Sequence, residues 1–277
     1  MSDLEKEVQS TMTRLKNAEN MLQTTSINLS NVINQDNYAT WIEKTQYAKQ
    51  LELTLPLFAL RQHSEKGLMD LLLLCQSRER ETVSSIVPYC GVSMPMASAR
   101  ELSIDSYLVA YWSVYDRLSN IIGRVVGNAS IRRNPLGKLN PKLVETFLAE
   151  KNGIDVLGMR ELIFKSYGYE IGFSYLIRNC YFHEGGMISD LPILSGLSFG
   201  DAFMLSDTVA EKLNNEISSR YKIPNVVIVK PDSLVRQLKD CHSKMDNLFV
   251  SLLRFMTGTL LVEIESFAAI DGFPISE

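Results

Sequence analysis

Apolar residues recur at helical spacing along most of the chain. Val8, Leu15, Leu22 and Leu29 follow one another every seventh residue, and neither Pro nor Gly interrupts residues 4–33. This stripe predicts a long helix. The surrounding Gln, Asn, Ser and Thr make it only moderately hydrophobic, and few of its a and d positions are strong, so the pattern favours a helix packed on its own domain over a coiled-coil arm.

Further stretches show the same period and predict more helices. The first, residues 37–80, predicts one or two helices, with a break or kink at Pro56 because proline lacks an N–H group. Within it, residues 64–67 (Ser-Glu-Lys-Gly) suggest a loop or weak point. The other predicted helices span residues 101–126, 141–150, 156–184, 206–220 and 232–264.

Proline, glycine and small residues gather in residues 87–98, which predicts a connection between two parts of the chain. We therefore divide the sequence into an N-terminal helical region, residues 1–98, and a helical domain, residues 99–277. A small β-hairpin is expected around Gly196 and Gly200, and residues 226–229 form a short β-branched run. The predicted fold class is mainly α, a helical bundle with a minor β-hairpin.

An aromatic stripe marks the predicted helix 101–126. Tyr107, Tyr111, Trp112 and Tyr115 recur at helical spacing, so they share one broad side of the helix. Such a stripe is more often core than a cofactor or base-stacking site, and we expect these rings to be buried.

The overall charge excludes a generally polycationic nucleic-acid binder, because the chain has 28 basic and 32 acidic residues and a net charge of −4. One basic loop remains, residues 131–142, with four positive charges and no negative one. Its residues Arg132, Arg133 and Lys138 are candidate RNA contacts.

The sequence also suggests where the chain works. No apolar run reaches the roughly 18–20 residues of a membrane span, and the polar, acidic start predicts no signal peptide. We therefore expect a cytoplasmic protein without a membrane partner. The cysteines are widely spaced and predict reduced, mostly buried thiols. They are Cys75, Cys90, Cys180 and Cys241.

Several common catalytic motifs are missing from the sequence. It has no GxGxxG or GxxxxGK[ST] phosphate loop, no HExxH, and no Cys/His pair at zinc spacing, so we predict neither a cofactor nor a metal. Residues 196–200 (Gly-Leu-Ser-Phe-Gly) match the GxSxG letters. They lack the strand-to-helix setting of a nucleophile elbow.

The strongest chemical candidate is the segment Arg178-Asn179-Cys180-Tyr181-Phe182-His183, which is followed by Glu184-Gly185-Gly186. Histidine transfers protons near neutral pH, and arginine stabilises charge that develops on phosphorus. Asparagine can orient the histidine or hydrogen-bond a phosphate. No metal is needed when the 2′-hydroxyl of RNA is the nucleophile.

Helix geometry constrains this segment. Asn179 and His183 lie one turn apart, whereas Arg178 and His183 are separated by about 140° around a continuous helix. Either the helix is distorted or ends early here, or two copies of the motif face each other in a symmetric dimer.

The Arg-Asn-x-x-x-His pattern resembles the signature of HEPN-domain ribonucleases, and the resemblance covers residues 101–264. The resemblance implies a HEPN-like α-helical bundle, a homodimer that joins the two motifs, and metal-independent cleavage of RNA. In this reading Arg178, Asn179 and His183 are the catalytic residues. Many members of the family are toxins or antiviral defence effectors, and others have lost catalysis.

Other interpretations stay open. Arg178 and His183 could form a helix-end ion pair with Glu170 or Glu184 instead. The chain would then be an inactive scaffold that binds a protein partner through the helix at residues 4–33, or a regulatory module that binds a nucleotide in the dimer cleft. Arg236 and His242 also fit the loose Arg/His spacing, and we interpret them as a solvated helix face.

Overall fold

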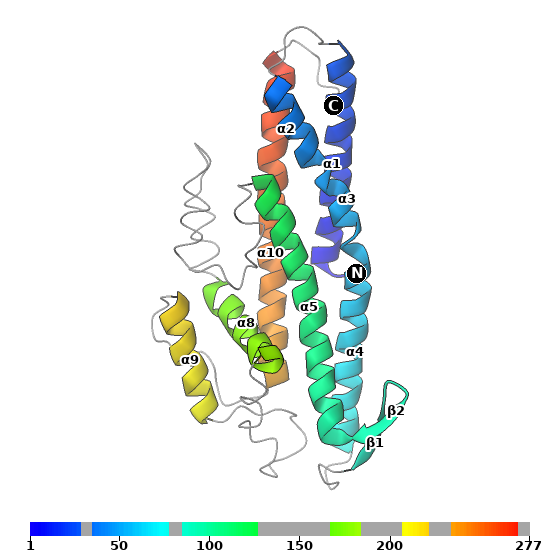
Figure 1. Ribbon diagram of the computed structural model, residues 1–277, viewed down its shortest axis with the longest axis vertical. Coiled ribbons are helices and arrows are strands. Elements are labelled where there is room, and N and C mark those ends of the chain that lie inside the picture. Colours follow the sequence, from blue (N-terminus) through cyan, green and yellow to red (C-terminus); the bar gives the residue numbers. More distant parts are fainter. Residues whose placement is uncertain (29–34, 78–84, 127–166, 184–206, 222–233, 271–277) are drawn as a thin grey trace.

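The computed structural model describes residues 1–28, 35–77, 85–126, 167–183, 207–221 and 234–270, and these are mainly helical (Figure 1). They also include one antiparallel two-stranded hairpin. The mainly α fold class with a minor hairpin is thus confirmed. The elements are α1 (Asp3–Asn28), α2 (Gln35–Thr45), α3 (Tyr47–Glu52), α4 (Leu55–Ser77), β1 (Ile86–Tyr89), β2 (Val92–Pro95), α5 (Met96–Val126), α8 (Tyr167–His183), α9 (Asp207–Tyr221) and α10 (Leu234–Ile270).

The long helix α10 follows the long axis of the molecule, and other helices pack on its two halves (Figure 1). α1 packs beside its C-terminal half, whereas α5 and α8 pack on its N-terminal half. α4 lies antiparallel to α5, so that the start of α4 is near the C-terminal half of α5. α8 crosses α10 obliquely, and its C-terminal turns lie close to α5.

α1 packs on the rest of its own chain, as its heptad stripe predicts. Its stripe positions Val8, Leu15 and Leu22 are at most 1% exposed. Polar contacts fix its register against α10, because Arg254 Nε donates to Glu7 Oε2 at 2.8 Å. This helix therefore does not form a coiled-coil arm.

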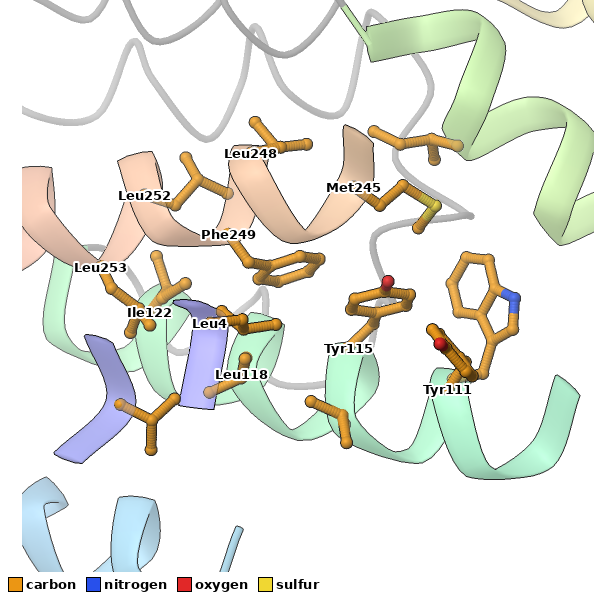
Figure 2. Close-up of a cluster of buried hydrophobic side chains, with 14 of the residues drawn as sticks. Leu4, Tyr111, Tyr115, Leu118, Ile122, Met245, Leu248, Phe249, Leu252 and Leu253 are labelled. Atoms are coloured by element: carbon orange, nitrogen blue, oxygen red, sulfur yellow. The ribbon is translucent and has the colours of Figure 1, made fainter. Parts of the chain in front are cut away.

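A single large core joins elements from both sides of residue 98. Figure 2 shows Leu4 of α1 close to Leu118 and Ile122 of α5 and to Phe249 and Leu253 of α10. All five are buried. Burying each such side chain stabilises the fold by about 1.5–3 kcal/mol, so the N-terminal helix and the last helix stabilise each other.

The aromatic stripe of α5 lies in this core, which confirms its predicted role. Tyr107, Trp112 and Tyr115 have no exposed surface, and Tyr111 is 4% exposed. The ring of Tyr115 stacks on Phe249 of α10, with centroids 4.9 Å apart and planes at 9°.

The predicted loop at residues 64–67 is wrong, because these residues lie inside α4. Gly67 costs a helix about 1 kcal/mol relative to alanine. Burial of Phe58, Leu68 and Leu71 along the same helix outweighs that cost. The break expected at Pro56 exists, and Pro56 is the second residue of α4, where a missing N–H is tolerated.

The hairpin lies at residues 86–95, where we predicted only a connection. Its two-residue turn is Cys90-Gly91, with φ of 51° and 79°. Positive φ at both central residues is what a type I′ turn requires. Of the two cysteines whose side chains the structure describes, Cys90 is exposed here and Cys241 is buried. The hairpin expected around Gly196 and Gly200 and the run 226–229 lie outside the described residues.

α10 is long and apolar enough to cross a membrane by length and composition, over Leu234–Ser266, which we did not expect from the sequence. Isolated charges such as Arg254 and Glu263 interrupt this stretch, so it contains no continuous apolar run of that length. Half of the most apolar window is buried inside the bundle. A buried core helix passes the same test, so this finding alone is weak evidence for a membrane span.

Candidate functional site

The helix that carries the candidate motif is α8, and it is apolar on almost all sides. Ile171, Phe173, Tyr175, Leu176 and Ile177 are all at most 7% exposed. A helix that is apolar all round belongs in an interior, and α8 packs against α5, α9 and α10. The motif begins where this buried stretch ends, so α8 carries Arg178 at the edge of the core.

α8 continues through Arg178 and Asn179 to His183, so it does not end early between the motif residues. On this helix the backbone positions of Arg178 and His183 are about 140° apart around the axis, and those of Asn179 and His183 about 40°. The side chains of residues 179–183 lie outside the described part. One chain therefore offers Arg178 and His183 on different sides of one helix.

α5 holds the side chain of Arg178 in place. Arg178 Nη2 lies 3.4 Å from Asp116 Oδ2, and its guanidinium carbon lies 5.3 Å from the centre of the Trp112 ring. Asp116 and Trp112 are one helical turn apart, so they form one cradle. The side chains of Arg178 and Asp116 are each 29% exposed.

The ion pair between Arg178 and Glu170, which the sequence left open as an alternative, is not formed. Glu170 instead accepts a hydrogen bond from Lys244 Nζ at 2.9 Å, and this pairing raises the pKa of Lys244. Glu184 lies outside the described residues. Arg178 does pair with a carboxylate, but that carboxylate comes from another helix, which sequence spacing along α8 cannot show.

This arrangement leaves Arg178 able to bind an anion. A guanidinium has five N–H donors, and the Asp116 contact uses one of its two terminal nitrogens at a distance longer than a normal hydrogen bond. Because both side chains reach solvent, an incoming phosphate can take the place of Asp116 or add to it. Asp116 and Trp112 thus orient the guanidinium of Arg178 and leave it accessible to solvent.

The second Arg/His pair of the sequence does not form a solvated face, which corrects our interpretation of it. Arg236 is exposed, but His242 is only 1% exposed. The ring of His242 stacks on Tyr111, with centroids 4.3 Å apart and planes at 16°. His242 Nε2 lies 2.7 Å from Ser174 Oγ, and Nδ1 lies 3.0 Å from the Tyr107 hydroxyl.

The hydrogen bonds of His242 suit a neutral ring. Burial lowers the pKa of His242 well below its ordinary value, and the positive charge of Arg61 lowers it further. A neutral imidazole has one donor and one acceptor nitrogen, and each faces a hydroxyl that can donate or accept. Trp112 Nε1, which can only donate, gives a hydrogen bond to Ser174 Oγ at 2.9 Å.

A buried ion pair continues this polar cluster toward α4. Arg61 and Asp246 form two contacts, one of them from Nη1 to Oδ1 at 2.9 Å. Tyr115 donates to Asp246 Oδ1 at 2.7 Å, and the Arg61 guanidinium lies 3.9 Å from the Tyr111 ring centre. The cluster therefore joins α4, α5, α8 and α10, and buried polar groups satisfied in this way fix how helices pack.

The His242 cluster is a structural feature and not a catalytic site. Tyr107 and Tyr115 have no exposed surface, and His242 has almost none, so a substrate has no access to these groups. Serine, histidine and tyrosine lie at hydrogen-bond distance here, but each is already engaged inside the core.

Other predicted candidates fall outside the described residues. These are Arg132, Arg133, Lys138 and the Gly196–Gly200 segment. Within the ranges that the structure covers, no group of three or more His, Cys, Asp or Glu side chains is placed to hold a metal ion. His63 is exposed on α4.

Sequence reasoning missed two groups of residues, Asp116 with Trp112, and His242. A signal for His242 was present, because Leu238, Met245 and Phe249 lie four before, three after and seven after it, which is the spacing of one buried helix face. Asp116 lies four residues after Trp112, but only the packing of α8 on α5 connects it with Arg178.

We compared the chain with protein-family models, curated proteins and solved structures, and none of them matches it.

Proposed function

We propose that this protein is a metal-independent endoribonuclease of the HEPN type that acts as a homodimer in the cytoplasm. The single observation that carries the proposal is the motif Arg178-Asn179-x-x-x-His183 on the last turns of a core helix, with Arg178 cradled at the solvent edge. An oriented, accessible guanidinium on the same helix as an amide and an imidazole suits phosphodiester chemistry.

The reaction needs only side chains of the two copies, water and the RNA itself. The 2′-oxygen of a ribose attacks the adjacent phosphorus, the bond from phosphorus to the 5′-oxygen breaks, and a 2′,3′-cyclic phosphate and a 5′-hydroxyl result. His183 either takes the proton of the 2′-hydroxyl while water protonates the leaving 5′-oxygen, or protonates the leaving 5′-oxygen while water takes the proton of the 2′-hydroxyl. Arg178 stabilises the negative charge that grows on the phosphate oxygens, and Asn179 hydrogen-bonds the phosphate or orients the imidazole.

A dimer can bring an Arg178 and a His183 to the same phosphate more easily than a single α8 helix. Since Arg178 and His183 are about 140° apart around α8, one phosphate is more easily reached by Arg178 of one copy and His183 of the other. A two-fold axis near the end of α8 would form such a site twice. The end of a helix also favours the protonated form of a histidine, which suits the role of general acid.

The test is cleavage of RNA in EDTA by the wild type, Arg178→Ala and His183→Ala. We expect both variants to lose at least about a hundredfold in rate, because each removes a charge or proton transfer used in the transition state. Arg236→Ala is the matched control, since it removes an exposed arginine from the other Arg/His pair and should cleave like the wild type. Equal cleavage by folded wild type, Arg178→Ala and His183→Ala would overturn the proposal.

A non-catalytic helical module is the second candidate, and the Arg178–Asp116 contact favours it by giving Arg178 a packing role. The partner surface expected for that candidate, α1, has its apolar stripe buried against the chain itself. Such a module would therefore need another surface. Unchanged stability of Arg178→Ala together with abolished cleavage would exclude this candidate, and reduced stability without any cleavage by the wild type would support it.

A further inference from the structure

A polar pocket lies on α5 beside the cradle of Arg178. Its volume is about 530 Å³, within the usual range for a small-molecule or nucleotide site. α5 forms one wall, and α3 and the start of α4 form the other. Its lining residues are Tyr47, Gln50, Leu57, Ser113, Asp116, Arg117, Asn120, Ile121 and Arg124.

The charges at the pocket favour an anion. Arg117 and Arg124 are exposed and contribute two positive charges. Asp116 is the acidic member of the lining, and it faces Arg178 across 3.4 Å, so its charge is offset by a third arginine. Arg117 Nη1 also donates to the Leu53 carbonyl oxygen at 2.7 Å, which fixes its position beside the pocket.

The uncharged side chains suit a nucleobase. The ring of Tyr47 is partly exposed, and the guanidinium carbon of Arg124 lies 6.0 Å from its centre. Leu57 and Ile121 add apolar surface, while the amides of Gln50 and Asn120 can donate to or accept from the polar edges of a base. Aromatic and arginine surfaces together with cationic groups are the usual means of binding single-stranded nucleic acid.

We propose that this pocket binds one nucleotide of a single-stranded RNA next to the phosphate held by Arg178, with Arg117 and Arg124 on the backbone phosphates and Tyr47 stacked on the base. The inference rests on the proposed ribonuclease function and adds to it where the substrate strand lies. Asp116 connects the two sites, because it lines the pocket and also contacts Arg178.

The test measures binding apart from cleavage. The full chain is titrated against a fluorescein-labelled, fully 2′-O-methylated RNA 12-mer in EDTA, and anisotropy is followed from low to high KCl. We expect Arg124→Ala and Arg117→Ala each to weaken binding about fivefold or more, and to lower the salt slope of log K by about 0.7 for each phosphate that the variant no longer neutralises. Tyr47→Ala should weaken binding about fivefold or more, whereas Tyr47→Phe keeps the stacking ring and should bind like the wild type.

The controls separate this inference from the proposed function. Arg236→Ala again removes one exposed arginine and should bind like the wild type, and circular dichroism checks that every variant is folded. If Arg124→Ala and Tyr47→Ala bind RNA like Arg236→Ala, the pocket inference is wrong, even where Arg178 and His183 prove essential for cleavage. Binding that depends on the pocket, without any cleavage, would uphold the inference and overturn the ribonuclease. Binding of AMP or UMP but not of the 12-mer would overturn the inference too.

Discussion

Arg178 of α8 and Asp116 of α5, which are 62 residues apart in sequence, form an ion pair at 3.4 Å between the two helices. The pair connects the candidate motif with the pocket on α5. Both side chains are partly exposed, so the pair contributes little to stability and more to the position of the guanidinium.

Replacing Asp116 tests that positioning role. Asp116→Ala should lower kcat for RNA cleavage about tenfold, because Arg178 loses the group that orients it, while the melting temperature changes little. The affinity for uncleavable RNA should stay the same or rise, since a negative charge leaves the pocket. A variant with wild-type kcat would show that Arg178 does not depend on Asp116.

Mixing two inactive variants tests the composite site. If Arg178 of one copy works with His183 of the other, a dimer of Arg178→Ala with His183→Ala contains one intact site and one without either group. After refolding together at equal amounts, half of the dimers are mixed, so about a quarter of wild-type cleavage should return. No recovery, with mixed dimers verified by two affinity tags, would contradict a site built from one residue of each copy.

The buried His242 predicts a loss of stability in mild acid. Because burial holds its pKa below the ordinary value of 6.5, the unfolded chain takes up a proton below about pH 6.5 that the folded chain does not. The free energy of unfolding should therefore be full above that pH and fall by up to about 1.4 kcal/mol per pH unit below it. Urea titrations from pH 7.5 to 5.0 measure this.

Two glutamine variants assign that pH dependence. His242→Gln cannot be protonated, so its stability should be lower overall but should fall less between pH 6.5 and 5.0 than that of the wild type. His63→Gln, which removes an exposed histidine outside the core, is the matched control. Equal acid sensitivity in wild type and His242→Gln would contradict the assignment.

The Arg61–Asp246 pair predicts a strong effect of single replacements. Arg61 and Asp246 have side chains only 9% and 15% exposed, and Arg61→Ala leaves a carboxylate without its partner in the core. We expect Arg61→Ala to cost about 3 kcal/mol or more of unfolding free energy in chemical denaturation. Arg61→Leu combined with Asp246→Leu should cost less than Arg61→Ala alone, since no unpaired charge remains.

An exposed pair serves as the comparison for that prediction. Lys16 and Glu52 lie 3.1 Å apart with side chains 44% and 56% exposed. Lys16→Ala should change stability by less than about 1 kcal/mol. If Arg61→Ala is as mild as Lys16→Ala, the buried pair is not important for the fold.

The sequence was informative wherever a feature depends on neighbours along one helix. The heptad stripe of α1 predicted its buried side, and the aromatic stripe of α5 predicted the core, because both follow from helical periodicity alone. The hairpin at Cys90-Gly91 was missed, since cysteine is uncommon at positive φ and its presence does not predict a type I′ turn.

Features that depend on packing between helices could not be predicted. His242 looked solvated because its neighbours Lys239 and Asp240 are polar, and its burial depends on tyrosines of α5 and a serine of α8. In the same way the contact of Arg178 with Asp116 needs the crossing of α8 over α5. The motif itself could be recognised in the sequence, but the residues that contact it depend on the tertiary structure.

The pairing of α1 with α10 has a consequence for how the chain is made. The partner of Glu7 is Arg254, 247 residues later, so during translation the part of α1 that packs on α10 stays uncovered until residue 254 has left the ribosome. Contacts at such separation form slowly, and an uncovered apolar helix is prone to aggregate in the meantime. Nascent chains of this protein should therefore depend on chaperones more than those of a helical bundle in which each helix packs mainly on the next one in sequence.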